Sequence, residues 1–232
     1  METAIAVAEE KARPFPVWHT AAVLGALAAL VGLSVVRPHG GEGHRLVHYV
    51  VAAAFEWGLT GWILMGCRMR RESVWSLLGE FTASWRTVLR DCGLAIGFLV
   101  TANVVLGLLG RWFGATTNGA LRNLLPRTAM ETAAYLCLTV TAAFCEELIY
   151  RGYLQRQFTA WTRSAGIGLV LQGIVFGACH AYQGRGMMLP IAVYGCLFGL
   201  LAMWRRSLRP GMIAHLVQDA VGGLALARTL LK

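Results

Sequence analysis

Charge is scarce in this sequence, and its scarcity excludes an ordinary soluble domain. Only 14% of the 232 residues are charged, whereas 56% are hydrophobic and the mean hydropathy is +0.56. A soluble domain carries about 25% charged residues, mostly on its surface. There is too little charge here to cover a globule, so much of the surface must face lipid.

Acidic residues are fewer than basic ones, which leaves a net charge of +9. Such an excess could indicate nucleic-acid binding, but the arginines lie between apolar runs, as at 68–71 and 205–209. Short basic clusters at the ends of spans orient a membrane protein and contact anionic headgroups. The sequence therefore predicts membrane lipids as partners and no nucleic acid.

The six cysteines include no CxxC motif, which argues against structural zinc and against a disulfide framework. Cys145 and Cys179 directly precede Glu146 and His180. Because adjacent residues of a helix point about 100° apart, we interpret these thiols as neighbours of a site and not as nucleophiles.

Long apolar runs predict an all-α fold, a polytopic transmembrane helical bundle of about seven spans. The runs cover 17–36, 46–66, 88–110, 129–157, 165–182, 188–204 and 210–230. They divide the chain into a polar N-terminal segment (1–16), N-terminal spans with their loops (17–128) and a C-terminal transmembrane core (129–232). The first run lacks a clean cleavage site, so we expect a retained signal anchor. With seven spans, 13 basic residues lie on the N-terminal side and 8 on the other, which predicts a cytoplasmic N-terminus.

Ionisable residues inside apolar spans are costly, so each one asks for a functional or structural reason. Glu146, Glu147 and Arg151 share one hydrophobic run. Glu147 and Arg151 are four residues apart and can pair on one helical face. Glu146 points elsewhere and has no local cation, which makes it a candidate general base or acid. A buried structural ion pair, with Glu146 facing a loop or headgroups, is the alternative interpretation.

Two histidines lie in the C-terminal runs. A lone His180 is more often a satisfied core residue than a catalytic one. His215 and Asp219 are four residues apart, so the carboxylate could orient the imidazole. Together, one glutamate and two histidines on three helices form a minimal set for activating water, with or without a metal. The sequence thus predicts that Glu146, His180 and His215 surround one pocket.

The motifs EExxxR (146–151), FxxxH (176–180) and HxxxD (215–219) follow one another across apolar spans. In this order they resemble the CAAX-protease and bacteriocin-processing (CPBP, or Abi) intramembrane proteases. The RGYL sequence at 151–154 and the glycine-rich stretch with its basic turn at 195–215 extend the resemblance, which covers about residues 129–222.

The resemblance implies that Glu146 activates water held by His180 and His215, with Glu147 and Arg151 as a supporting pair. The last motif position is typically Asn in the prenyl-protein proteases, where its amide can donate to an oxyanion. Here it is Asp219, which cannot donate when ionised, so we expect it to orient His215. The family is described both as metal-dependent and as metal-free. We favour no required cofactor, and Zn²⁺ held by Glu146, His180 and His215 is the alternative.

Three functions remain open at this point. The first is an intramembrane endopeptidase that acts on a membrane-associated or C-terminally processed protein substrate, and the intact motifs favour it. The second is a non-catalytic role in bacteriocin immunity or membrane scaffolding. The third is a proton-coupled transporter, which would usually show an internal repeat that is absent from this sequence.

Overall fold

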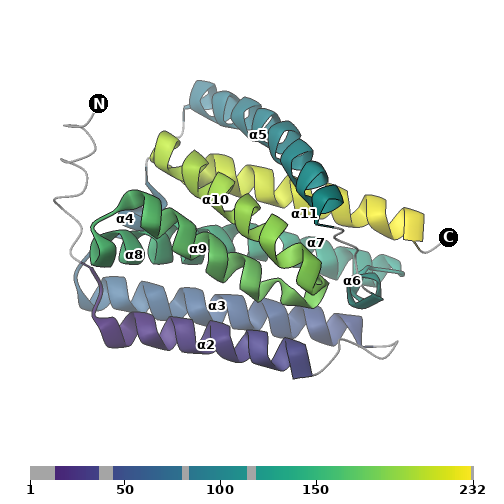
Figure 1. Cartoon of the computed structure of the whole chain (residues 1–232), viewed down its shortest axis with the longest axis horizontal. Helices are drawn as coiled ribbons and strands as arrows, with labels where there is room; N and C mark the ends of the chain where they lie inside the picture. Colours follow the sequence, from purple (N-terminus) through teal and green to yellow (C-terminus); the bar gives the residue numbers. More distant parts are fainter. Residues whose placement is uncertain (1–13, 37–43, 80–83, 114–118, 231–232) are drawn as a thin grey trace.

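The computed structural model describes residues 14–36, 44–79, 84–113 and 119–230, and the regular elements within them are all helical (Figure 1). The all-α prediction is confirmed. Most of the polar segment 1–16 lies outside the described residues. In chain order the elements are α2 (Val17–Val36), α3 (Arg45–Met69), α4 (Trp75–Leu78), α5 (Trp85–Trp112), α6 (Gly119–Leu124), α7 (Ala129–Glu146), the π-helix η1 (Glu147–Leu154), α8 (Gln155–Thr162), α9 (Ala165–Cys179), the 3-10 turns η2 (Ala181–Gln183) and η3 (Arg185–Met187), α10 (Met188–Arg205) and α11 (Arg209–Leu230).

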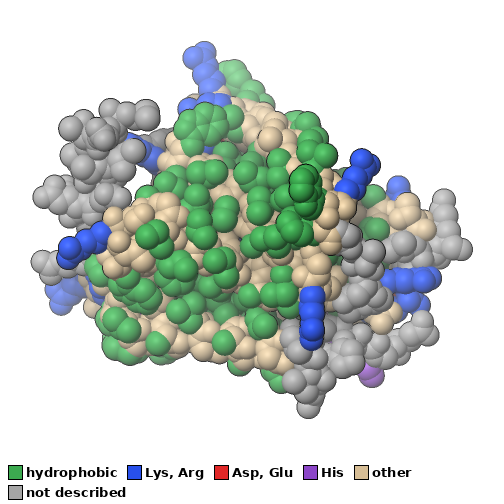
Figure 2. All heavy atoms as spheres, in the orientation of Figure 1, with side chains coloured by type: hydrophobic (Ala, Val, Ile, Leu, Met, Phe, Trp, Pro, Cys, Tyr) green, Lys and Arg blue, Asp and Glu red, His purple; other side chains and the backbone are tan. Residues whose placement is uncertain are grey.

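Among the described residues, 4 helical stretches are long and apolar enough to cross a membrane. They are Arg45–Met69, Trp85–Trp112, Ala129–Thr162 and Arg185–Arg205. Figure 2 shows hydrophobic side chains over the visible face, with Lys and Arg side chains toward its edges. A multi-pass membrane protein is therefore supported. The further apolar helices Val17–Leu33 and Ala165–Cys179 are shorter, so the number of seven spans stays a prediction.

The centre of the core follows η1, whose eight residues are all buried. Helix α3 packs against α7, and α10 packs closely against α9. Gly173 and Gly177 permit this close approach, because a Cβ atom at either position would collide with Cys196 or Met188 across the interface. Helices α7, η1 and α8 form one continuous rod, which packs against α3, α9 and α10.

The N-terminal helix α2 is tied to this rod by polar contacts. The ring of His19 lies with its Nδ1 2.7 Å from the hydroxyl of Tyr153 and its Nε2 3.1 Å from the carbonyl oxygen of Trp62. The backbone N–H of Phe15 donates to Oε1 of Gln157 at 2.9 Å. Helices outside the C-terminal core are thus part of the same packed body.

Helix α5 lies along α11 at one side of the bundle (Figure 1). Most of its large apolar side chains are exposed, as expected of a lipid-facing helix; Ile96 is 65% exposed and Val100 64%. Its buried Asp91 forms an ion pair with Arg209, the first residue of α11, with Oδ2 and NH2 2.5 Å apart. This pair fixes one end of α5 to the start of the helix that carries His215.

Candidate active site

The site begins at the junction of α7 and η1. Thr128 caps α7, since its hydroxyl accepts from the backbone N–H of Glu131 at 3.1 Å and the Glu131 side chain accepts from the Thr128 backbone. Glu146 is the last residue of α7, and Glu147 is the first of the π-helix. π-Helical turns are rare and occur often at functional sites. A π-helical turn is wider than an α-helical turn, so the side chains after Glu146 point in other directions than they would on a continuous α-helix.

Glu147 and Arg151 form the ion pair that their spacing indicates, with Oε1 and NH1 3.0 Å apart and both side chains fully buried. Arg151 also donates to the carbonyl oxygen of Gly195 at 3.3 Å, and its guanidinium group lies 4.3 Å from the centre of the Phe176 ring. Gln172 donates to the same carbonyl oxygen at 2.9 Å. Arg151 is therefore held by α9 and α10 as well as by its carboxylate.

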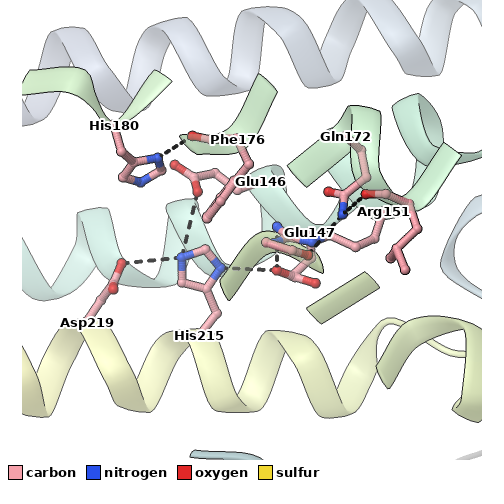
Figure 3. A network of polar contacts seen from close by, with 10 residues as sticks. Glu146, Glu147, Arg151, Gln172, Phe176, His180, His215 and Asp219 are labelled. Carbon is pink, nitrogen blue, oxygen red and sulfur yellow. Dashed lines mark hydrogen bonds and ion pairs between the residues drawn. The ribbon is translucent and has the colours of Figure 1, made fainter. Parts of the chain in front are cut away.

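His215 reaches this rod from α11, and its ring lies between carboxylates (Figure 3). Its Nδ1 is 3.3 Å from Oε1 of Glu147. Its Nε2 is 3.7 Å from Oε2 of Glu146 and 3.5 Å from Oδ2 of Asp219. Gly211 allows the approach of α11, because a Cβ atom there would lie only 2.7 Å from Oε2 of Glu147.

His180 lies one residue beyond the end of α9, which stops at Cys179 and not at 182 as the apolar run indicates. Its Nδ1 lies 2.8 Å from the carbonyl oxygen of Phe176, one of the last carbonyls of the helix, which have no partner within the helix itself. Figure 3 shows the Glu146 carboxylate between the rings of His180 and His215. The Phe176 ring lies 4.5 Å from the His180 ring and 6.4 Å from that of His215. The structure therefore brings together Glu146 of α7, His215 of α11 and His180 at the end of α9.

The contacts of both imidazoles place a hydrogen on Nδ1. A carbonyl oxygen only accepts, so Nδ1 of His180 must carry the hydrogen that it donates to Phe176. The Glu147 carboxylate, paired with Arg151, can accept in the same way from Nδ1 of His215. Nε2 of His215 faces the carboxylates of Glu146 and Asp219, whereas Nε2 of His180 is left to accept. The imidazole of His180 and the Glu146 carboxylate can therefore bind and orient a water molecule beside His215.

Glu147 therefore has a contact that the sequence did not indicate. Spacing along α11 gave the orienting role to Asp219, whose carboxylate lies at Nε2 and is 37% exposed. The Nδ1 of His215 instead contacts Glu147, which belongs to another helix. No local pattern could have revealed this, because the two residues are 68 positions apart.

A metal ion was the other possible occupant of the space between these side chains. Within the part of the chain that the structure describes, no group of three or more His, Cys, Asp or Glu side chains is arranged to hold a metal ion. The donor set of Glu146, His180 and His215 does not form such a group in this structure. We therefore derive no catalytic step through a metal.

A further carboxylate near the site was missed by the sequence analysis. Glu56 of α3 interacts electrostatically with Glu146, His215 and Asp219. The next residue, Trp57, stacks on Phe144 with ring centres 5.6 Å apart, which aligns this turn of α3 with the end of α7. An acidic residue inside the apolar run 46–66 was a detectable signal of the same kind as Glu146.

Comparison with known proteins finds a family match within the C-terminal half of the chain. Residues 128–221 match the family described as "Type II CAAX prenyl endopeptidase Rce1-like". A curated relative, the "Uncharacterized protein YpbD" of Bacillus subtilis (strain 168), is 33% identical over 86 residues, which cover 36% of this chain and 41% of that protein. The chain thus spans less than half the length of the curated relative it matches. No solved structure matches the chain. The match includes Glu146, Glu147, Arg151, His180, His215 and Asp219, and residues 128–221 are therefore a domain of the Rce1-like CAAX prenyl endopeptidase (CPBP/Abi) family.

Proposed function

We propose that this protein is an intramembrane endopeptidase that hydrolyses a peptide bond of a membrane-associated or C-terminally processed protein. The observation that carries the proposal is the convergence of Glu146, His180 and His215 on one space within a domain of a peptidase family. A non-catalytic immunity or scaffolding protein would not need these side chains to face one another. The supporting pair is also present, since Glu147 and Arg151 form an ion pair next to Glu146.

Glu146 acts as the general base in this mechanism. The 3.7 Å between its Oε2 and Nε2 of His215 is too long for a direct hydrogen bond and suits a bridging water. The water donates one hydrogen to Glu146 and the other to a histidine Nε2. As its oxygen attacks the carbonyl carbon, Glu146 takes a proton, and the carbonyl π electrons move to oxygen. When the C–N bond breaks, Glu146 gives this proton to the leaving amine.

The supporting residues hold the catalytic groups in place. Arg151 compensates the buried charge of Glu147, and Glu147 in turn keeps the Nδ1 hydrogen on His215. Asp219 lies at Nε2, on the side of the ring that faces the water. Its negative charge favours any positive charge that develops on the imidazole during proton transfer.

The membrane arrangement that we propose has seven spans and a cytoplasmic N-terminus, as the basic residues indicate. Helices α2, α9 and α11 would then cross or enter the bilayer beside the four long apolar spans. The substrate reaches the site from the bilayer or its surface. A protein with a lipid-modified or transmembrane C-terminal segment fits this geometry and the family description.

The direct test uses purified protein in proteoliposomes and a quenched fluorogenic peptide that ends in a farnesylated CAAX sequence. Glu146→Gln keeps the volume of the side chain and removes the proton acceptor, so turnover should fall by about 10²–10⁴-fold while the protein still inserts and unfolds like wild type. Turnover of the Gln variant at the wild-type rate would eliminate Glu146 as the base. Activity that is lost to a chelator and restored by Zn²⁺ would replace the metal-free mechanism.

A further inference from the structure

One carboxylate lies among three guanidinium groups where the start of α5, the end of α10 and the start of α11 meet (Figure 1). Asp91 of α5 is buried, and its Oδ2 accepts from Nε of Arg209 at 2.7 Å. Arg90 of α5 and Arg205, the last residue of α10, lie beside its other oxygen, Oδ1. Three positive charges thus face one negative charge, so the cluster carries an excess of positive charge.

The two arginines beside Oδ1 are held only loosely by Asp91. Nε of Arg90 is 3.5 Å and NH2 of Arg205 is 3.6 Å from Oδ1, whereas charge-assisted N–H···O bonds are about 2.7–2.9 Å long. Among the described residues, neither arginine forms an ion pair with another carboxylate. Nε of Arg205 is buried and has no hydrogen-bond partner among them. An orphaned donor of a charged group indicates a partner that the protein itself does not supply.

The cluster lies near the level of the lipid headgroups. Trp85 at the start of α5 is 65% exposed, and Trp204 near the end of α10 is 68% exposed. Exposed tryptophans gather at the membrane–water interface. Asp91 follows Trp85 by six residues, which is about 9 Å along the helix. The side chain of Arg90 is 52% exposed and that of Arg205 18%, so a headgroup can reach both.

Further along α5, the face that carries Arg90 is apolar and open. Gly93 and Gly97 follow Arg90 by three and seven residues, so they lie on the same face of the helix. Both are exposed, and a Cβ atom at either position would meet nothing within 4 Å. Val100 and Val104 continue this face and are 64% and 57% exposed. An acyl chain can lie here while its headgroup stays beside Arg90, whereas a soluble anion would have no use for such a face.

We propose that Arg90 and Arg205 bind the phosphate of one anionic phospholipid, whose acyl chain lies along the open face of α5 at Gly93 and Gly97. The phosphate supplies negative charge that Asp91 alone does not, and arginine binds phosphate through paired, directional hydrogen bonds. Exposed arginines such as Arg68 attract anionic lipids only through a surface field that salt screens. The site is independent of the proposed peptidase chemistry.

Thermal unfolding in nanodiscs tests this site without any substrate. The full chain is placed in discs of phosphatidylcholine with a rising share of phosphatidylglycerol. The unfolding temperature of wild type should rise with that share and level off when the site is filled, because a ligand that binds only the folded protein stabilises it. Native mass spectrometry should find one phosphatidylglycerol molecule retained by wild type.

Two variants and a matched control locate the site. Arg205→Gln and Arg90→Gln each remove a charged donor, so the share of phosphatidylglycerol at half-saturation should increase about tenfold or more. Arg68→Gln removes the same charge from an exposed position in the last turn of α3 and should leave the half-saturation point unchanged. If Arg205→Gln does not fold, Arg90→Gln decides the result, since that side chain is 52% exposed and tolerates replacement.

Three outcomes would overturn the proposal. The first is a wild-type unfolding temperature that does not change with the share of phosphatidylglycerol. The second is an equal loss in Arg68→Gln and Arg90→Gln, because the attraction would then come from the charge of the whole surface. The third is a rise of the same size with inorganic phosphate in pure phosphatidylcholine discs, because the site would then take a soluble anion. None of these measurements depends on cleavage, so failure of the peptidase function would leave them unchanged.

Discussion

Two buried ionic clusters contact the first turns of α11, and they differ in the balance of their charges. At the start of the helix, the single carboxylate of Asp91 faces Arg209 at 2.5 Å, Arg90 at 3.5 Å and Arg205 at 3.6 Å. Two turns later, His215 lies among carboxylates that outnumber the one nearby guanidinium group. The first cluster is a clamp between α5, α10 and α11, because a guanidinium group from each of these helices faces its one carboxylate.

In the second cluster, one carboxylate has no guanidinium partner among the described residues. Glu147 is paired with Arg151, whereas the ion-pair contact of the adjacent Glu146 is to Nε2 of His215, at 3.7 Å. A buried charge is therefore not enough to identify an active site, since structural networks also bury charges. An uncompensated carboxylate that faces two imidazoles is the more specific indication. The variants below test this distinction.

The largest effect on stability is expected for Arg151→Ala. The substitution leaves Glu147 as an uncompensated buried charge, which should lower the free energy of unfolding by about 3–5 kcal/mol. Thermal unfolding in detergent measures the change. Adding Glu147→Gln should recover part of the loss, because the double variant no longer buries a charge. A single variant that melts like wild type would show that the pair is not needed for folding.

Asp91→Asn should have a smaller effect, of a different kind. Asp91 accepts charge-assisted hydrogen bonds, so its loss should cost about 1.5–3 kcal/mol in the free energy of unfolding. Turnover per folded molecule should stay unchanged, because Asp91 contacts none of the proposed catalytic residues. Both quantities are measured on the same purified sample. Loss of turnover in a fully folded variant would contradict the purely structural role and would mean that the clamp positions His215.

The smallest effect is expected for Asp219→Asn. Glu147 already fixes the tautomer of His215 through Nδ1, and the Asp219 side chain is partly exposed. Loss of a residue that supports a catalytic group typically costs 10–100-fold, and we expect about tenfold or less in kcat/KM. Steady-state kinetics on the fluorogenic peptide gives the value. If Asp219→Asn were as inactive as Glu146→Gln, Asp219 would be essential to the chemistry.

The sequence predicted much of the fold because hydropathy is a local signal. The last apolar run, 210–230, became α11 (Arg209–Leu230), and the run 88–110 became α5 (Trp85–Trp112). The pairing of Glu147 with Arg151 followed from spacing alone. These features depend on residues within a few turns of one another, so periodicity and composition were sufficient.

The parts that the sequence missed depend on contacts between helices. The π-helix after Glu146 lies within an unbroken run of helix-forming residues, and nothing local marks it. The contact of His215 with Glu147 joins α11 to η1, and the stacking of Trp57 on Phe144 joins α3 to α7. Only the packing of the bundle creates these neighbours. His180 was placed inside a span, whereas it follows the last turn of α9.

The most direct measurement of the central claim is made in native membranes. Membranes that contain wild-type protein or the Glu146→Gln variant are compared by mass spectrometry of the C-terminal peptides of their proteins. We expect at least one membrane-associated protein whose C-terminus is shortened only when Glu146 is present. Identical sets of C-terminal peptides, with both forms of the protein folded and equally abundant, would contradict the claim that this site hydrolyses peptide bonds.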